Sequence, residues 1–102
     1  MKLIIPSSVK NIESYALWGL EGVTEIVFED GVESIGDYAV YNCKYLKKIT
    51  IPESVTYIDD VGVGYLDSNE ENVISKDLVI VAKKGSAAEK YARDNGFKVE
   101  NN

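Results

Sequence analysis

The chain has 102 residues, enough for one domain, and its net charge of −6 argues against a nucleic-acid partner, because phosphate backbones select clustered Lys and Arg. It has no histidine and one cysteine, which excludes histidine-based catalysis, histidine or cysteine-rich metal sites and an internal disulfide. No stretch approaches the roughly 20 apolar residues of a membrane span, so we expect no membrane insertion, and no residue set points to a cofactor.

Apolar residues return every 23 positions through most of the chain. Four columns have three copies each: Leu3, Ile26 and Ile49; Ile5, Phe28 and Ile51; Val9, Val32 and Val55; Ile12, Ile35 and Ile58. A fixed period of this size is typical of a solenoid, in which each coil buries its apolar edge against the next. We therefore predict a right-handed solenoid, mostly β within the α/β class, with the members of each column as lateral neighbours.

The coils are expected at 3–25, 26–48 and 49–77, and each opens with a strand. The strands 3–5, 26–28 and 49–51 alternate so that the outer two side chains point inward and the middle one outward. Pro6 and Pro52 end two of these strands, since proline cannot donate to a ladder.

A polar residue, Ser14, Asp37 or Asp60, follows the second apolar pair of each coil. These are good N-cap residues, so we expect each to begin a single helical turn, as at 15–18 and 38–41.

The period fails after Gly64, where a polar stretch predicts a loop insertion at 65–77. A strand is expected from Leu78, 29 residues after Ile49, so this coil carries six extra residues. Ser86 and Glu89 have capping-box spacing and predict a helix that stops at Asn95-Gly96, before a short strand at 97–99. Residues 78–102 would form a C-terminal cap, and the whole chain 1–102 a single repeat domain.

Two segments carry a family resemblance. The pattern I-x-I-P-x-S-V-x-x-I at 49–58, preceded by C-x-x-L-x-x-I at 43–49, resembles the BspA-type leucine-rich repeat, and 84–97 is similar to the C-terminal cap of such proteins. Leu17, Val40 and Val63 stand where the family often has Phe, and Leu20 where Cys is usual, but these sites stay apolar. The resemblance implies a bacterial cell-surface or secreted protein of adhesion type, often with more repeats and with attachment modules.

The outward strand residues form the first candidate ligand face. It comprises Ile4, Val27, Thr50 and Val79, with Lys2, Glu25 and Lys48 alongside. Solenoids commonly bind through their parallel sheet. The simpler interpretation, which the sequence favours, is a stabilising sheet surface with alternating charges across neighbouring strands.

Aromatic residues form a second candidate surface, with Tyr15 and Tyr38 in one column and Trp18 and Tyr41 in another. They could serve as a platform for sugar rings or a protein partner. The favoured interpretation is that aromatics on successive coils pack on one another and cover the core.

Other candidates are weaker. Cys43 lies in an inward column and is expected to be a buried, inert thiol. The acidic stretch at Asp67, Asn69 and Glu71 lacks the Gly and Glu that an EF-hand loop needs, so a solvated loop is favoured over calcium binding.

The sequence therefore favours a non-enzymatic module that binds an unidentified protein or glycan, with a purely structural spacer as the alternative. Leu3, Ile5 and Val9 have no partner on their outer flank, which predicts further repeats upstream or self-association through the first coil. Met1 would then be a start placed on an excised fragment.

Overall fold

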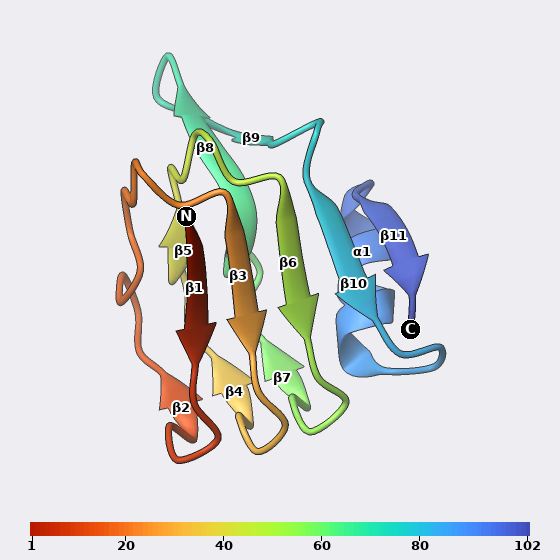
Figure 1. Ribbon diagram of the computed structural model, residues 1–102. Helices are drawn as coiled ribbons and strands as arrows, with labels where there is room; N and C mark the ends of the chain where they lie inside the picture. The colour runs from red at the N-terminus through yellow and green to blue at the C-terminus, as the bar shows by residue number, and fades with distance from the viewer.

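The computed structural model describes residues 1–102, and the chain winds as a right-handed coil with three sides (Figure 1). A five-stranded sheet forms the first side, with its strands in the order β1 (Lys2–Ile5), β3 (Glu25–Phe28), β6 (Lys48–Ile51), β10 (Val79–Ala82) and β11 (Lys98–Asn101). All neighbours in this sheet are parallel. Leu3 pairs with Ile26 and Ile26 with Ile49, which confirms the predicted column.

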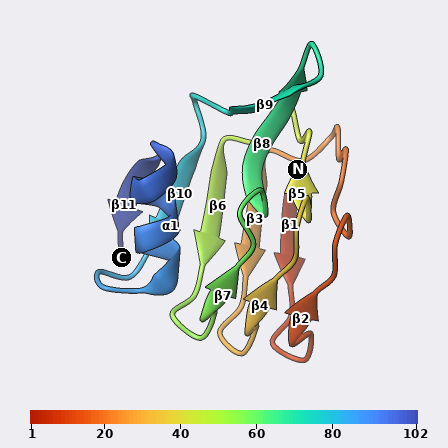
Figure 2. The same cartoon turned by 180° about the vertical axis from the view of Figure 1, so that it is seen from behind.

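Turning the molecule around brings the other two sides to the front (Figure 2). The second side is a parallel sheet of three short strands, β2 (Asn11–Ile12), β4 (Ser34–Ile35) and β7 (Tyr57–Ile58). On the third side, β5 (Val40–Tyr41) pairs in parallel with β8 (Val63–Ser68), which forms an antiparallel hairpin with β9 (Glu71–Ile74).

Inward side chains from the three sides meet in one core. Ile26, Phe28, Ile49 and Ile51 are fully buried there, and the inward residues of β10 continue the same cluster. Each such apolar side chain contributes about 1.5–3 kcal/mol through burial. The stacked apolar columns are therefore the main source of stability.

The predicted helical turns are wrong. Tyr15 and Tyr38 have positive φ angles of 64° and 57°, which a right-handed helix does not allow. The amide of Tyr15 donates to the Asp37 carbonyl and that of Leu17 to the Ala39 carbonyl, so the backbone bonds to the next coil instead. The Asp37 side chain likewise accepts from the Val61 amide of the next coil rather than capping its own turn. Hydrogen bonding between coils thus overrides the local capping signal.

The predicted loop at 65–77 is also wrong, because most of it forms the β8–β9 hairpin. Asn69 and Glu70 occupy its two-residue turn with φ angles of 52° and 66°, the left-handed conformation that such turns require. Polar composition alone does not distinguish an exposed hairpin from a loop.

The register of the next strand differs from the prediction by two residues. Ile80 pairs with Ile49, so the third coil carries eight extra residues rather than six. Val79 consequently lies beside Lys48, and Val81 takes the place beside Thr50 that was predicted for Val79. Leu78 and Ile80 point inward in either register, so the alternation of inward and outward residues does not distinguish the two registers.

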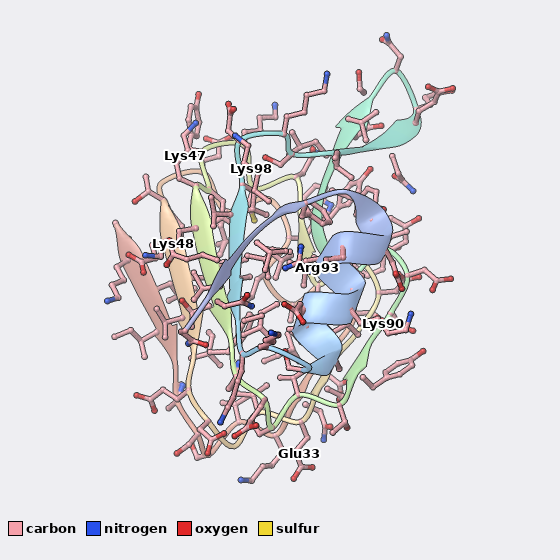
Figure 3. The ribbon with its side chains drawn as sticks, turned by 90° about the vertical axis from the view of Figure 1, so that its right-hand side faces the viewer. Glu33, Lys47, Lys48, Lys90, Arg93 and Lys98 are labelled. Carbon is pink, nitrogen blue, oxygen red and sulfur yellow. The ribbon has the colours of Figure 1, made fainter.

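The C-terminal cap forms as predicted, with helix α1 (Ala87–Asn95) between β10 and β11. The Ser86 hydroxyl accepts from the Glu89 amide (3.2 Å), and Gly96 ends the helix at φ 84°. Figure 3 views this end of the coil, with α1 and β11 lying across it. The nine-residue α1 is the one helix, and no helix has the length and apolarity to span a bilayer.

The cap takes the place of the second and third sides of a fourth coil, whose strand in the large sheet is β10. The Tyr91 hydroxyl donates to the Val63 carbonyl (2.9 Å) and accepts from the Val63 amide (3.1 Å), so it takes the place of a ladder partner. Phe97 packs on the backbone of Gly64 so closely that a Cβ there would lie 2.6 Å from the ring. The C-terminal end of the core is consequently closed.

Candidate ligand-binding surfaces

The outer side of the five-stranded sheet, called the sheet face below, carries two rows of side chains. The first row is Lys2, Glu25, Lys48, Val79 and Lys98; the second is Ile4, Val27, Thr50, Val81 and Glu100. No other segment of the chain crosses in front of these strands (Figure 1). Seven of these positions were proposed from the sequence, and all seven lie on the sheet face; Val79 stands in the lysine row rather than in the apolar one.

The two halves of the sheet face differ in exposure. Lys48 forms an ion pair with Glu100 (3.7 Å) across β10, and Val81 beneath it is only 4% exposed. On the other half, Ile4 is 51% exposed and Val27 is half-buried. The open half of the sheet face, defined by Ile4, Val27 and Thr50, is therefore the part accessible to a ligand.

Lysines gather at the beginning of the later strands. Lys47 and Lys98 lie near this edge, and Lys48 lies lower on the outer side of the sheet (Figure 3). Glu25 lies between Lys2 and Lys48 in the sheet, as predicted, but Lys48 pairs with Glu100 instead. The rows together hold three lysines and two glutamates, an excess of one positive charge in a chain of net charge −6.

The aromatic cluster, Tyr15, Trp18, Tyr38 and Tyr41, lies on the third side of the coil. The Tyr15 and Tyr38 rings stack with centroids 5.3 Å apart and planes 4° apart, and Tyr41 meets Tyr38 edge-on at 4.9 Å. Tyr41 is buried, whereas Tyr15 and Trp18 remain 59% and 53% exposed. Trp18 and Tyr41 share a repeat position, but their rings form no stacked pair.

Asn72 on β9 joins the hairpin to the aromatic cluster. Its Oδ1 accepts from the Tyr41 hydroxyl (2.7 Å), and its Nδ2 donates to the Tyr38 hydroxyl (3.3 Å). Asp67 is the direct cross-strand neighbour of Asn72. Burial and then the Asp67 carboxylate raise the pKa of Tyr41, so its hydroxyl stays protonated as a donor. No sequence pattern pointed to Asn72, because the hairpin alone brings it to the tyrosines.

An open groove of about 380 Å³ lies between α1 and the second side, and sequence reasoning missed it. Tyr57, Asp60, Lys90 and Tyr91 are among its lining residues. Lys90 is already paired with Asp94 (2.6 Å), and the Tyr57 hydroxyl is hydrogen-bonded to Asp59, which raises the Tyr57 pKa. The polar groups at this groove are thus largely engaged with one another.

The remaining sequence candidates are Cys43 and the acidic stretch of the hairpin. Cys43 is buried, its thiol donates to the Leu17 carbonyl (3.3 Å), and burial raises its pKa, as for an unreactive core residue. Asp67, Asn69 and Glu71 lie on the hairpin, and no group of three or more metal-ligating side chains is assembled anywhere in the chain.

Comparison with known proteins gives one match. The family model described as "BspA type Leucine rich repeat region (6 copies)" matches residues 1–81. No curated protein and no solved structure matches the chain.

Proposed function

The chain belongs to the BspA-type leucine-rich repeat family, and on that premise we propose that it is a non-enzymatic binding module that docks a protein partner on the open half of its sheet face. The protein would act at a bacterial cell surface or outside the cell, as an adhesion-type module. Family membership supports a repeat module of this kind, and repeat proteins bind through extended, uncovered surfaces.

One observation carries the proposal: an uncovered strip of Ile4, Val27 and Thr50, two aliphatic side chains and one threonine, runs beside a row that holds Lys2, Glu25 and Lys48. An exposed strip of this kind is expected to mark an interaction site. Neither cavity of the molecule is lined by residues of the sheet face, so a small molecule there would stay largely in water, whereas a protein surface could cover it. The surplus of lysine in the neighbouring row favours a partner with acidic residues around an apolar centre.

The test is a binding screen of the purified chain against an array of extracellular proteins and glycans. The double substitution of Val27→Lys and Thr50→Lys should abolish binding of any protein that the array identifies, because two lysines would break the strip. Thr56→Lys is the matched control, since Thr56 is exposed away from this sheet.

Unchanged affinity of the double variant would exclude the sheet face as the binding site. An array on which no protein binds would favour the alternative function, a structural spacer without a ligand of its own.

A further inference from the structure

We propose that the aromatic cluster is a second binding site, separate from the sheet face, and that it takes a short neutral oligosaccharide. The sheet-face proposal concerns a protein partner on the first side, whereas β5, which contributes Tyr41 to the aromatic cluster, lies on the third side of the same coil (Figure 2). The two proposals therefore succeed or fail independently.

The cluster holds its tyrosines in a conformation that costs free energy. Bulky residues rarely adopt positive φ, yet Tyr15 and Tyr38 both do. Val61, the equivalent residue of the third coil, has no positive φ, so the coil can be built without this conformation. Amide hydrogen bonds to the next coil hold this conformation at both tyrosines, and backbone strain of this kind is found preferentially at ligand-binding sites.

The exposed ring faces suit the apolar face of a sugar. Tyr15 is fixed against Tyr38 by stacking, so its outer face is flat and presented to solvent at little further entropic cost. The negative face of an aromatic ring attracts the polarised C–H groups on one side of a pyranose. Trp18 offers a second exposed ring within the same turn.

The polar groups of the cluster suit sugar hydroxyls. Asn72 is held by Tyr38 and Tyr41, and it keeps one free N–H and one free lone pair. Asp67 lies directly opposite Asn72 in the hairpin. An amide and a carboxylate together accept from and donate to neighbouring hydroxyls, whereas an anionic sugar would be repelled by Asp67.

The arrangement sets the length of the ligand. Asn72 contacts Tyr38, the inner ring of the stack, whereas the exposed face belongs to the outer ring, Tyr15. A single sugar ring on Tyr15 does not reach the amide, so we expect at least two linked sugars. A proline-rich peptide fits less well, since the Tyr15–Tyr38 stack closes the gap between rings that such peptides occupy.

The test titrates the intact chain with hexamers of neutral sugars, namely β-1,4-linked glucose, N-acetylglucosamine and mannose and α-1,4-linked glucose, and with the corresponding monosaccharides. The fluorescence of Trp18, the one tryptophan, reports binding, and calorimetry confirms it. At least one hexamer should bind saturably and more tightly than its monosaccharide. Tyr15→Ala should weaken this binding about tenfold, and Asn72→Ala should reduce the advantage of the hexamer.

The matched control is Tyr45→Ala, because Tyr45 is equally exposed (59%) but has no aromatic neighbour. It should leave the affinity unchanged, as should Val27→Lys on the sheet face. Circular dichroism shows that each variant is folded.

Four results would overturn the proposal: no hexamer binds, Tyr15→Ala and Tyr45→Ala have equal effects, a polyproline peptide binds while the hexamers do not, or Tyr15→Ala alters only the association of the chain with itself.

Discussion

The two ends of the coil contain the same apolar columns but differ in what covers them. At the C-terminal end, α1 and β11 close the core, and Tyr91, Phe97 and Ala88 are buried. At the N-terminal end, Leu3, Ile5 and Val9 are only half-buried, although their equivalents in the second coil are fully buried. An apolar side chain at a given repeat position therefore contributes more stability in the middle of the stack than at its N-terminal end, because full burial requires a neighbour on both flanks.

The largest expected effect is a difference in the loss of unfolding free energy between Ile26 and Leu3, two members of one column. Ile26→Ala, in the second coil, removes a fully buried side chain and should lower the free energy of unfolding by about 2–5 kcal/mol. Leu3→Ala, in the first coil, should cost only about 1 kcal/mol, because Leu3 is half-buried and leaves no closed cavity. Urea unfolding measures both values, and equal losses would contradict the comparison.

The next effect concerns the closed end. Tyr91→Phe keeps the ring but leaves the Val63 amide and carbonyl without their partner, which should cost about 1–3 kcal/mol. Tyr45→Phe, at an exposed ring, should change stability by less than about 0.5 kcal/mol. If thermal unfolding shows no difference between these variants, the hydroxyl does not substitute for a ladder partner.

The helix cap should contribute less. Ser86→Ala removes the acceptor for the Glu89 amide and should lower stability by about 1 kcal/mol. Ser8, an exposed serine in a turn of the first coil, provides the control substitution Ser8→Ala. If the two variants have the same urea midpoint, the cap does not depend on the hydrogen bond between Ser86 and the Glu89 amide.

The pH dependence of the cap should be smaller still. The Gly85 amide, then Asn101 and Arg93, lower the pKa of Glu89 from 4.5 to about 2. The carboxylate therefore stabilises the folded state fully above pH 4.5, and this contribution is lost as the pH falls from 4.5 through 2. Glu89→Gln should remove it, so the stability of the variant should fall less over this range. Parallel unfolding curves of the two proteins between pH 6 and 2.5 would contradict this assignment.

Self-association through the open end is expected to be the weakest effect. A second copy could cover Leu3, Ile5 and the free edge of β1, but the area offered by one coil is small, so association should appear only at high concentration. Static light scattering should show a rising mass for the unmodified chain and none for Ile5→Lys. A strictly monomeric chain at high concentration would contradict the prediction.

The amino-acid sequence alone determined the solenoid. The 23-residue period fixed the columns of Leu3, Ile26 and Ile49, and local signals fixed the helix that begins after Ser86 and ends at Gly96. The stacking of Tyr15 on Tyr38 also follows from the period, because equivalent residues of adjacent coils lie side by side. Repeats are predictable in this way since each coil meets only its neighbours, and every neighbour has the same pattern.

The tertiary structure decided what lies outside the repeat. Three features join segments that share no period: the hairpin that brings Asn72 to the tyrosines, the two-residue shift that places Val81 beside Thr50, and the hydrogen bonds between Tyr91 and Val63. The left-handed backbone at Tyr15 and Tyr38 belongs to the same group, because amide bonds to the next coil outweigh the local preference for a capped turn. Local patterns could not anticipate these features, since each depends on a hydrogen bond or packing contact that exists only once distant segments have come together.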